Sequence, residues 1–272
     1  LYGAILPKGG LQFPQPTSHD RVVAGFFDEI PRDAVVSTMS AYAPHLTTRK
    51  DIYLFPDVAD SEYLLLDTGM HANYWPHEGL KARDRSLADM LPHLKSGEFG
   101  VVREEDGVIL LRRGHETGGN ADAVRVMFSP VLEAEELRSD FDGSVLSDGA
   151  ASGGQARAVT PAQRREDGRN GLVYGPYLDL QPGFYRATFV MKAGSRPEDR
   201  VVKIDVFTHK DGYPRVEREI RGVDFAQAGV YQAFAVEFNT SGQALEDVEV
   251  RAFYDFTADL AVDRVELEYL GQ

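Results

Sequence analysis

The segment covering residues 70–78 gathers the side chains best suited to binding a metal ion or a polar ligand. It includes His71, His77 and Glu78, and imidazole and carboxylate groups are common zinc ligands. Their spacing matches neither a helical nor a zinc-type motif, which favours packing within an aromatic loop over a metal site. Trp75 lies in the same loop and, as an alternative, is suited to a membrane surface or a neighbouring domain.

Motifs of familiar catalytic sites are absent from the sequence. There is no Gly-x-Ser-x-Gly turn, no phosphate-binding loop and no His-Glu-x-x-His. The lack of cysteine removes thiol catalysis, thiolate metal sites and disulfides. Acidic pairs are abundant, but a glycosidase needs two carboxylates about 5–10 Å apart across a cleft, a separation that a sequence does not show. A secreted polysaccharide hydrolase is therefore the least favoured functional alternative.

The overall charge narrows the choice of partners. The chain has 272 residues and a formal net charge of −14, and both halves are acidic. Such a field repels phosphate backbones and anionic membrane surfaces, which argues against nucleic-acid binding. No apolar run approaches the roughly 20 residues that a membrane helix requires.

Residues 1–117 are predicted to form a small α/β domain of two or three layers, which would position any polar site in this part. After an extended lead-in rich in Pro and Gly, Ser18 is predicted to cap a helix that ends before Pro31. Short apolar runs alternate with helical segments, a pattern typical of a parallel sheet with crossovers. The predicted elements are a helix over 18–30, strands over 34–39, 51–55 and 62–67, a helix over 83–95 and a hairpin over 98–113.

Residues 121–272 are predicted to form an antiparallel β-sandwich, so that the chain is α+β overall, with a linker at residues 118–120. Apolar residues alternate with polar ones in run after run, which indicates strands that each bury one face. Gly183, Gly212, Gly229 and Gly242 mark turns between these runs. The clearest runs cover 185–191, 202–207, 234–238, 248–256 and 265–269.

Residues 1–115 resemble the soluble tail of a family of bacterial multi-spanning membrane proteins, known as domain of unknown function 2079. The resemblance is carried by several segments in a fixed order, at positions 30–31, 34–37, 44–46, 49, 52–56, 62–67, 99–102 and 106–114. The family is similar to membrane glycosyltransferases that use polyprenyl-linked sugars. The resemblance implies an extracytoplasmic region attached to a membrane domain of the same polypeptide, and it assigns no catalytic residue here. The chain begins at Leu1 rather than Met, and we expect it to belong to a longer protein.

Residues 128–272 are similar to carbohydrate-binding modules of families 6 and 35, which are jelly rolls. Those modules begin with a Glu-Ala-Glu strand, matched at 133–135, and carry a Pro-Gly-x-Tyr strand midway, matched at 182–185. They end with a strand containing an aspartate, matched by Asp263. The resemblance implies a jelly-roll sandwich that binds a glycan.

The same resemblance implies a structural calcium ion held by Glu133, Glu135 and Asp263. Residues two apart on a strand point to one face, and clustered carboxylates need a cation to offset their repulsion. Calcium takes about six to eight oxygen ligands, so these three side chains would need backbone carbonyls or water beside them. The alternative is a solvated acidic edge of a strand without a metal.

Sugar binding in such modules uses loop aromatics that stack on pyranose faces. Tyr174 and Tyr177 are the first candidates, and Tyr213 is the next. The alternative is that each tyrosine packs at the end of a strand. His45 follows Pro44 in the first resembling segment, where a structural role is favoured over a ligand contact.

Three functions follow in order of preference. The first is a non-catalytic extracytoplasmic region of a membrane glycosyltransferase-like protein, whose sandwich binds a glycan or a lipid-linked sugar. The second is a rigid spacer or protein-interaction module without a sugar site, because sandwich folds serve many functions. The third is the secreted hydrolase named above.

Overall fold

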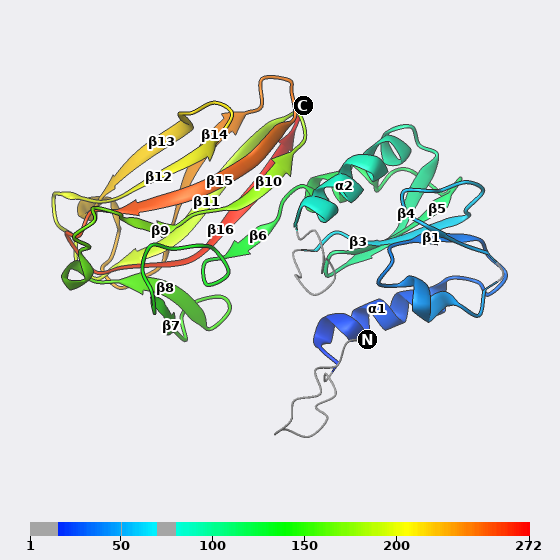
Figure 1. Ribbon diagram of the computed structural model, residues 1–272, viewed down its shortest axis with the longest axis horizontal. Coiled ribbons are helices and arrows are strands. Elements are labelled where there is room, and N and C mark those ends of the chain that lie inside the picture. Colours follow the sequence, from blue (N-terminus) through cyan, green and yellow to red (C-terminus); the bar gives the residue numbers. More distant parts are fainter. Residues whose placement is uncertain (1–15, 50, 70–79) are drawn as a thin grey trace.

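The computed structural model describes residues 16–49, 51–69 and 80–272. It contains two layered parts, one built around a five-stranded mixed sheet and one formed by two stacked antiparallel sheets (Figure 1). We call them the α/β unit, from α1 to α3, and the sandwich, from β6 to β16. The α+β class and the jelly-roll sandwich predicted from the sequence are confirmed.

The sheet of the α/β unit has the strand order β2-β1-β3-β5-β4. The first three strands in the chain are parallel, whereas β5 runs antiparallel to β3 and β4 antiparallel to β5. The expected parallel sheet is therefore a mixed one, because the predicted hairpin joins its edge. The strands are β1 (Val36–Thr38), β2 (Ile52–Leu54), β3 (Tyr63–Asp67), β4 (Phe99–Glu105) and β5 (Val108–Arg113).

Helices cover both faces of this sheet, so the unit has three layers. Helix α1 (Ser18–Glu29) lies on one face, and α2 (Leu80–Lys95) lies on the other (Figure 1). The N-cap of α1 is Thr17 rather than the predicted Ser18. The Thr17 hydroxyl accepts a hydrogen bond from the Asp20 amide, and the Asp20 carboxylate accepts one from the Thr17 amide.

A third helix, α3 (Asn120–Met127), begins at the last residue of the suggested linker and occupies the start of the segment predicted as sandwich. Its first side chain is buried and donates hydrogen bonds to the carbonyl oxygens of Leu94 and Phe99, at 2.9 and 2.8 Å. The same side chain accepts a hydrogen bond from the Val101 amide. These bonds fix the start of α3 to α2 and β4, so the glycine pair before it leads into a helix.

The two sheets of the sandwich enclose the larger part of the hydrophobic core. One sheet has the order β10-β15-β12-β13, with β9 also paired to β15, and the other has the order β14-β11-β16-β8-β7, with β6 paired to β16. The strands are β6 (Val131–Glu133), β7 (Val145–Ser147), β8 (Gln155–Val159), β9 (Gly171–Val173), β10 (Pro176–Leu180), β11 (Phe184–Ala193), β12 (Arg200–Thr208), β13 (Pro214–Arg221), β14 (Gln232–Asn239), β15 (Leu245–Tyr254) and β16 (Leu260–Gly271). Short 3-10 helices cover Ala43–Leu46, Pro161–Gln163 and Gly222–Asp224.

The two parts are joined by polar contacts from α2 to the β10–β15 edge. The Asp179 amide donates a 2.7 Å hydrogen bond to the Asp84 carboxylate, which is buried. Lys81 forms ion pairs with Asp179 and Asp247, the second at 2.9 Å. Arg83 is also buried and pairs with Asp84 at 3.0 Å. The contact between α2 and the sandwich therefore consists of one hydrogen bond to a buried carboxylate and two partly exposed ion pairs of Lys81.

Among the residues described, none of the helices combines the length and the apolar character needed to cross a bilayer.

Candidate functional site

The outer face of the β10-β15-β12-β13 sheet carries an unusual mixture of aromatic and charged side chains. In β12 the residues Val202, Ile204 and Val206 point into the core, so the intervening Lys203, Asp205 and Phe207 point outward. In β15 the core residues Val248, Val250 and Ala252 alternate in the same way with outward Glu249, Arg251 and Phe253. The pairing of β12 with β15 brings these two outward rows side by side.

A buried ion pair forms the floor at the centre of this face. Asp205 lies directly opposite Arg251 in the pairing of β12 with β15, and its carboxylate accepts hydrogen bonds from Nε and Nη2 of Arg251 at 2.7 and 2.8 Å. Asp205 is fully buried, whereas the guanidinium lies 3.9 Å from the ring centroid of Phe207 and 5.0 Å from that of Phe253. The floor therefore consists of the apolar rings of Phe207 and Phe253 with the planar guanidinium of Arg251 fixed against them.

A groove of about 450 Å³ runs over this floor. Two further ion pairs lie along it: Arg200 donates to the Asp255 carboxylate at 2.6 and 2.9 Å, and Lys203 pairs with Glu217 at 3.3 Å. The groove is lined by Asn170, Arg200, Lys203, Phe207, Gly212, Pro214, Arg251, Phe253 and Asp255. A groove with half-buried rings and several fixed polar groups is suited to a ligand that has both apolar faces and hydroxyl groups.

Tyr177 lies at the end of the same sheet, in a cluster with three polar side chains. The His209 ring stacks on it with a centroid separation of 6.2 Å, and the Arg138 guanidinium lies 4.9 Å from its centroid. His209 also pairs at 3.1 Å with Glu249, which is only 5% exposed. Burial raises the pKa of Glu249, and the charges of Arg251 and His209 offset part of that rise.

The other two tyrosine candidates differ in exposure. Tyr213 is 65% exposed in the β12–β13 turn, next to the groove residues Gly212 and Pro214. Tyr174 is half-buried in the β9–β10 turn and exchanges two backbone hydrogen bonds of 3.0 Å with Arg138. Tyr177 lies in β10, two strands away from the β12–β13 hairpin that carries Tyr213. Its backbone has a left-handed φ of +71°, which bulky residues rarely adopt. The structure thus leaves Tyr213 free to contact a ligand and packs Tyr174 and Tyr177 more tightly.

The groove residues were not among the sites predicted from the sequence. A signal was present, because Phe207 and Phe253 are apolar at outward positions, where the usual alternation places polar residues. The alternation of β12 and β15 shows which residues point outward, but the register that sets Asp205 against Arg251 links positions far apart in the chain.

Two of the three predicted calcium ligands, Glu133 and Asp263, meet at Ser152. Its hydroxyl donates to the Glu133 carboxylate at 3.0 Å and lies 2.8 Å from the Asp263 carboxylate, to which the Ser152 amide also donates. Glu135 reaches the neighbouring Gly153, where an added Cβ would lie 3.1 Å from its Oε1. The prediction placed Glu133 and Glu135 on one face of the same strand, but β6 ends at Glu133 and Glu135 lies in the following turn.

The electrostatics of this acidic cluster are consistent with a cation. Burial raises the pKa of Glu133, and repulsion from Glu135 and Asp263 adds to the rise. The Oε2 atom of Glu135 is buried and has no hydrogen-bond partner. Asp263 is already paired with Arg264, however, and no three His, Asp or Glu side chains of the described residues form a ready-made metal cluster. Oxygen donors, one of them an orphaned carboxylate atom, are the ligand type that calcium prefers.

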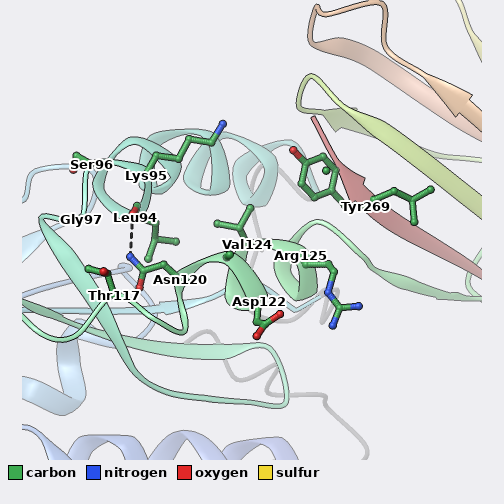
Figure 2. A pocket seen from close by; sticks show the side chains of 13 residues that line it. Leu94, Lys95, Ser96, Gly97, Thr117, Asn120, Asp122, Val124, Arg125 and Tyr269 are labelled. Carbon is green, nitrogen blue, oxygen red and sulfur yellow. Dashed lines mark hydrogen bonds between the residues drawn. The ribbon is translucent and has the colours of Figure 1, made fainter.

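A larger groove of about 720 Å³ lies between α2, α3 and the end of β16 (Figure 2). Two of its polar side chains, those of Asn120 and Tyr269, are already engaged within the protein. Asn120 is engaged by main-chain atoms, and one of these bonds, to Leu94, is drawn in Figure 2. Tyr269 is only 8% exposed and packs 5.2 Å from Tyr185, centroid to centroid. The sheet-face groove is therefore the stronger candidate, although it is smaller.

His45 lies outside both candidate sites. His45 is exposed and its ring stacks on Phe27 at 5.3 Å, an arrangement consistent with the favoured packing role. His71, Trp75, His77 and Glu78 lie outside the described residues.

Comparison with known proteins identifies similar folds only. No protein-family profile matches the chain, and no curated protein sequence matches it. Residues 1–115 therefore have no family assignment beyond the resemblance noted above. Among solved structures, the C-terminal family 6 carbohydrate-binding module of a marine laminarinase from Zobellia galactanivorans is 10% identical, with a TM-score of 0.33. That match covers 52% of this chain and 98% of the module.

Two further solved structures illustrate the range of matches. A family 6 carbohydrate-binding module of Cellvibrio mixtus lichenase 5A, in complex with cellotriose, is 9% identical with a TM-score of 0.31, and the match covers 51% of this chain and 95% of the module. An exo-β-1,3-galactanase from Phanerochaete chrysosporium is 17% identical with a TM-score of 0.36, and the match covers 51% of this chain and 29% of the enzyme. At these identities and scores the likeness carries no conclusion about a ligand, which must be argued from the site itself.

Proposed function

We propose that this chain is a non-catalytic part of a larger protein, and that its sandwich binds a glycan along the outer face of the β10-β15-β12-β13 sheet. The observation that carries the proposal is the groove over Phe207, Phe253 and the fixed Arg251–Asp205 pair. Pyranose rings have apolar faces that pack on such rings and hydroxyl edges that need donors and acceptors. A side chain already fixed by an internal partner loses little freedom when a ligand binds.

Isothermal titration of the chain against a panel of soluble glycans tests the proposal. Phe253→Ala and Tyr213→Ala should each weaken binding by about fivefold, since an aromatic contact contributes roughly 1 kcal/mol. Phe184→Ala is the matched control, because Phe184 is 54% exposed at the start of β11 in the other sheet. Equal losses in all three variants would place the site elsewhere. Absence of binding to every glycan in the panel would favour a spacer or protein-interaction module.

Calcium at the acidic cluster is a second part of the proposal. Glu133, Glu135 and Asp263 would hold the ion, and its charge would offset both the burial and the repulsion that raise the pKa of Glu133. Because the cluster joins the turn after β6 to residue 152 and β16, calcium should raise the melting temperature of the chain. Glu135→Gln should abolish that rise, while Glu136→Gln, an exposed neighbour, should leave it intact. An unchanged melting temperature in calcium and in EDTA would refute the metal site.

The attachment to a membrane protein is proposed from the residues shared with the family of unknown function. In this view the chain lies on the extracytoplasmic face, and the α/β unit docks on a membrane domain of the same polypeptide that resembles a glycosyltransferase. The reading frame upstream of Leu1 tests it directly. Several apolar spans of about 20 residues each would support the proposal, and a secretion signal alone would remove it.

A further inference from the structure

The charges of the sheet-face groove point to the class of glycan that it accepts. We propose that the groove binds an uncharged polysaccharide and discriminates against acidic ones such as uronates. This inference rests on the proposed function, because it concerns the ligand of the same groove. The observation behind it is that each cation lining the groove already has a carboxylate partner from the protein.

The pairing of these cations is close and, at the centre, buried. Arg251 has both hydrogen bonds to Asp205, a residue without any exposed surface. Arg200 lies between Asp255 and Glu219 and donates three hydrogen bonds to their carboxylates, two to Asp255 and one to Glu219. Lys203 pairs with Glu217 on the neighbouring strand β13. Three cations therefore face four carboxylates, which leaves the groove with no net positive charge.

An acidic polysaccharide would meet two electrostatic costs in this groove. Its carboxylates would compete with a protein carboxylate for each cation, and drawing Arg251 away from Asp205 would leave a charge buried without a partner. They would also approach a chain whose net charge is −14. Neither cost arises for a ligand without charge.

Hydroxyl groups can use the same paired charges without separating them. A carboxylate oxygen has more than one acceptor position, and a guanidinium has five N–H donors, of which Asp205 takes two from Arg251. Hydrogen bonds from neutral groups to ionised ones are also stronger than those between neutral groups. The groove thus offers a neutral glycan strong hydrogen bonds at no cost in ion pairing.

Polymers that share a backbone and differ in charge test the inference. Hydroxyethyl cellulose is compared with carboxymethyl cellulose, methyl-esterified homogalacturonan with its de-esterified form, and arabinoxylan with glucuronoxylan, by affinity electrophoresis of the full chain. We expect at least one neutral member to bind, and its acidic partner to bind about tenfold more weakly or not at all. Equal or tighter binding of the acidic member would overturn this inference and leave the proposed function standing. Absence of binding to every polymer would overturn both.

A substitution that frees one cation gives an independent test. Glu217→Gln removes the partner of Lys203 and should strengthen binding of the acidic polymers by about two- to fivefold, the range of an exposed ion pair. The gain should disappear at about 1 M NaCl, where screening is nearly complete, and neutral polymers should bind as before. Glu237→Gln is the matched control, since Glu237 pairs with Arg186 on the other sheet and should change neither affinity. A similar gain in both variants would show that only the net charge matters.

Discussion

Removing the guanidinium from the groove floor should destabilise the whole sandwich. In Arg251→Met the Asp205 carboxylate would remain fully buried, but without the two hydrogen bonds of 2.7 and 2.8 Å that neutralise it. The methionine keeps much of the apolar contact with Phe207 and Phe253. The loss is therefore mainly the penalty of a buried charge without a partner.

The magnitude follows from the burial of the two partners. Breaking a buried ion pair by removing one member costs about 3–5 kcal/mol. The side chain of Asp205 has no exposed surface, but that of Arg251 is 18% exposed, so water can reach part of the site. We therefore expect the lower limit of about 3 kcal/mol, which corresponds to a fall in melting temperature of about 6–12 °C for a chain of this size.

Urea unfolding followed by circular dichroism measures the effect, and a double-mutant cycle separates charge from packing. Asp205→Asn removes the charge at nearly constant shape, so the Arg251→Met/Asp205→Asn pair should be more stable than Arg251→Met alone. Arg186→Met is the control, because Arg186 pairs with Glu237 and Glu268 on an exposed surface and should change stability by less than about 1 kcal/mol. A loss below about 1 kcal/mol in Arg251→Met, or strict additivity in the cycle, would refute the reasoning.

Three further predictions concern the α/β unit. Burial lowers the pKa of His19, but hydrogen bonds and attraction to Asp106 and Asp67 more than offset this and raise the pKa above 6.5. The protonated ring should therefore stabilise the fold fully below pH 6.5, and this contribution should be lost as the pH rises through the raised pKa. Urea unfolding of the wild type and of His19→Gln across this pH range measures the effect. Asn120→Ala should cost about 1–3 kcal/mol of unfolding free energy, since three main-chain groups lose their partner. Gly100→Ala should cost at least about 1–3 kcal/mol, because its Cβ would lie 2.3 Å from the Glu116 carbonyl oxygen; a melting temperature equal to that of the wild type would contradict it.

The sandwich was predictable because its signal is repeated. Strands such as β11, β12 and β15 each show a period of two, and several such runs in succession leave few alternatives to stacked sheets. The helix α3 was missed for the opposite reason. It is only eight residues long, follows two glycines, and depends on the contacts of Asn120 with α2 and β4 rather than on local preference.

The two candidate sites show where sequence reasoning stops. Glu133, Glu135 and Asp263 were grouped through a resemblance, and the structure joins Glu133 and Asp263 through Ser152, whereas Glu135 lies in a turn beside Gly153. The groove could not be assembled from the sequence, because Asp205 and Arg251 meet only through the register of two strands. Register depends on the packing of whole sheets, which local patterns do not specify.

The contacts that Lys81 and Asp84 make with the edge of the sandwich have a consequence for reach. A binding module on a flexible linker samples a wide volume, and its effective concentration falls as the linker lengthens. Here the buried Asp84 carboxylate accepts a hydrogen bond from the Asp179 amide, and Lys81 pairs with the Asp179 carboxylate. A rotation of the sandwich about α2 would break both contacts. The groove should therefore keep one orientation relative to the α/β unit. A glycan bound in it would lie at a fixed angle and distance from any structure to which that unit is attached.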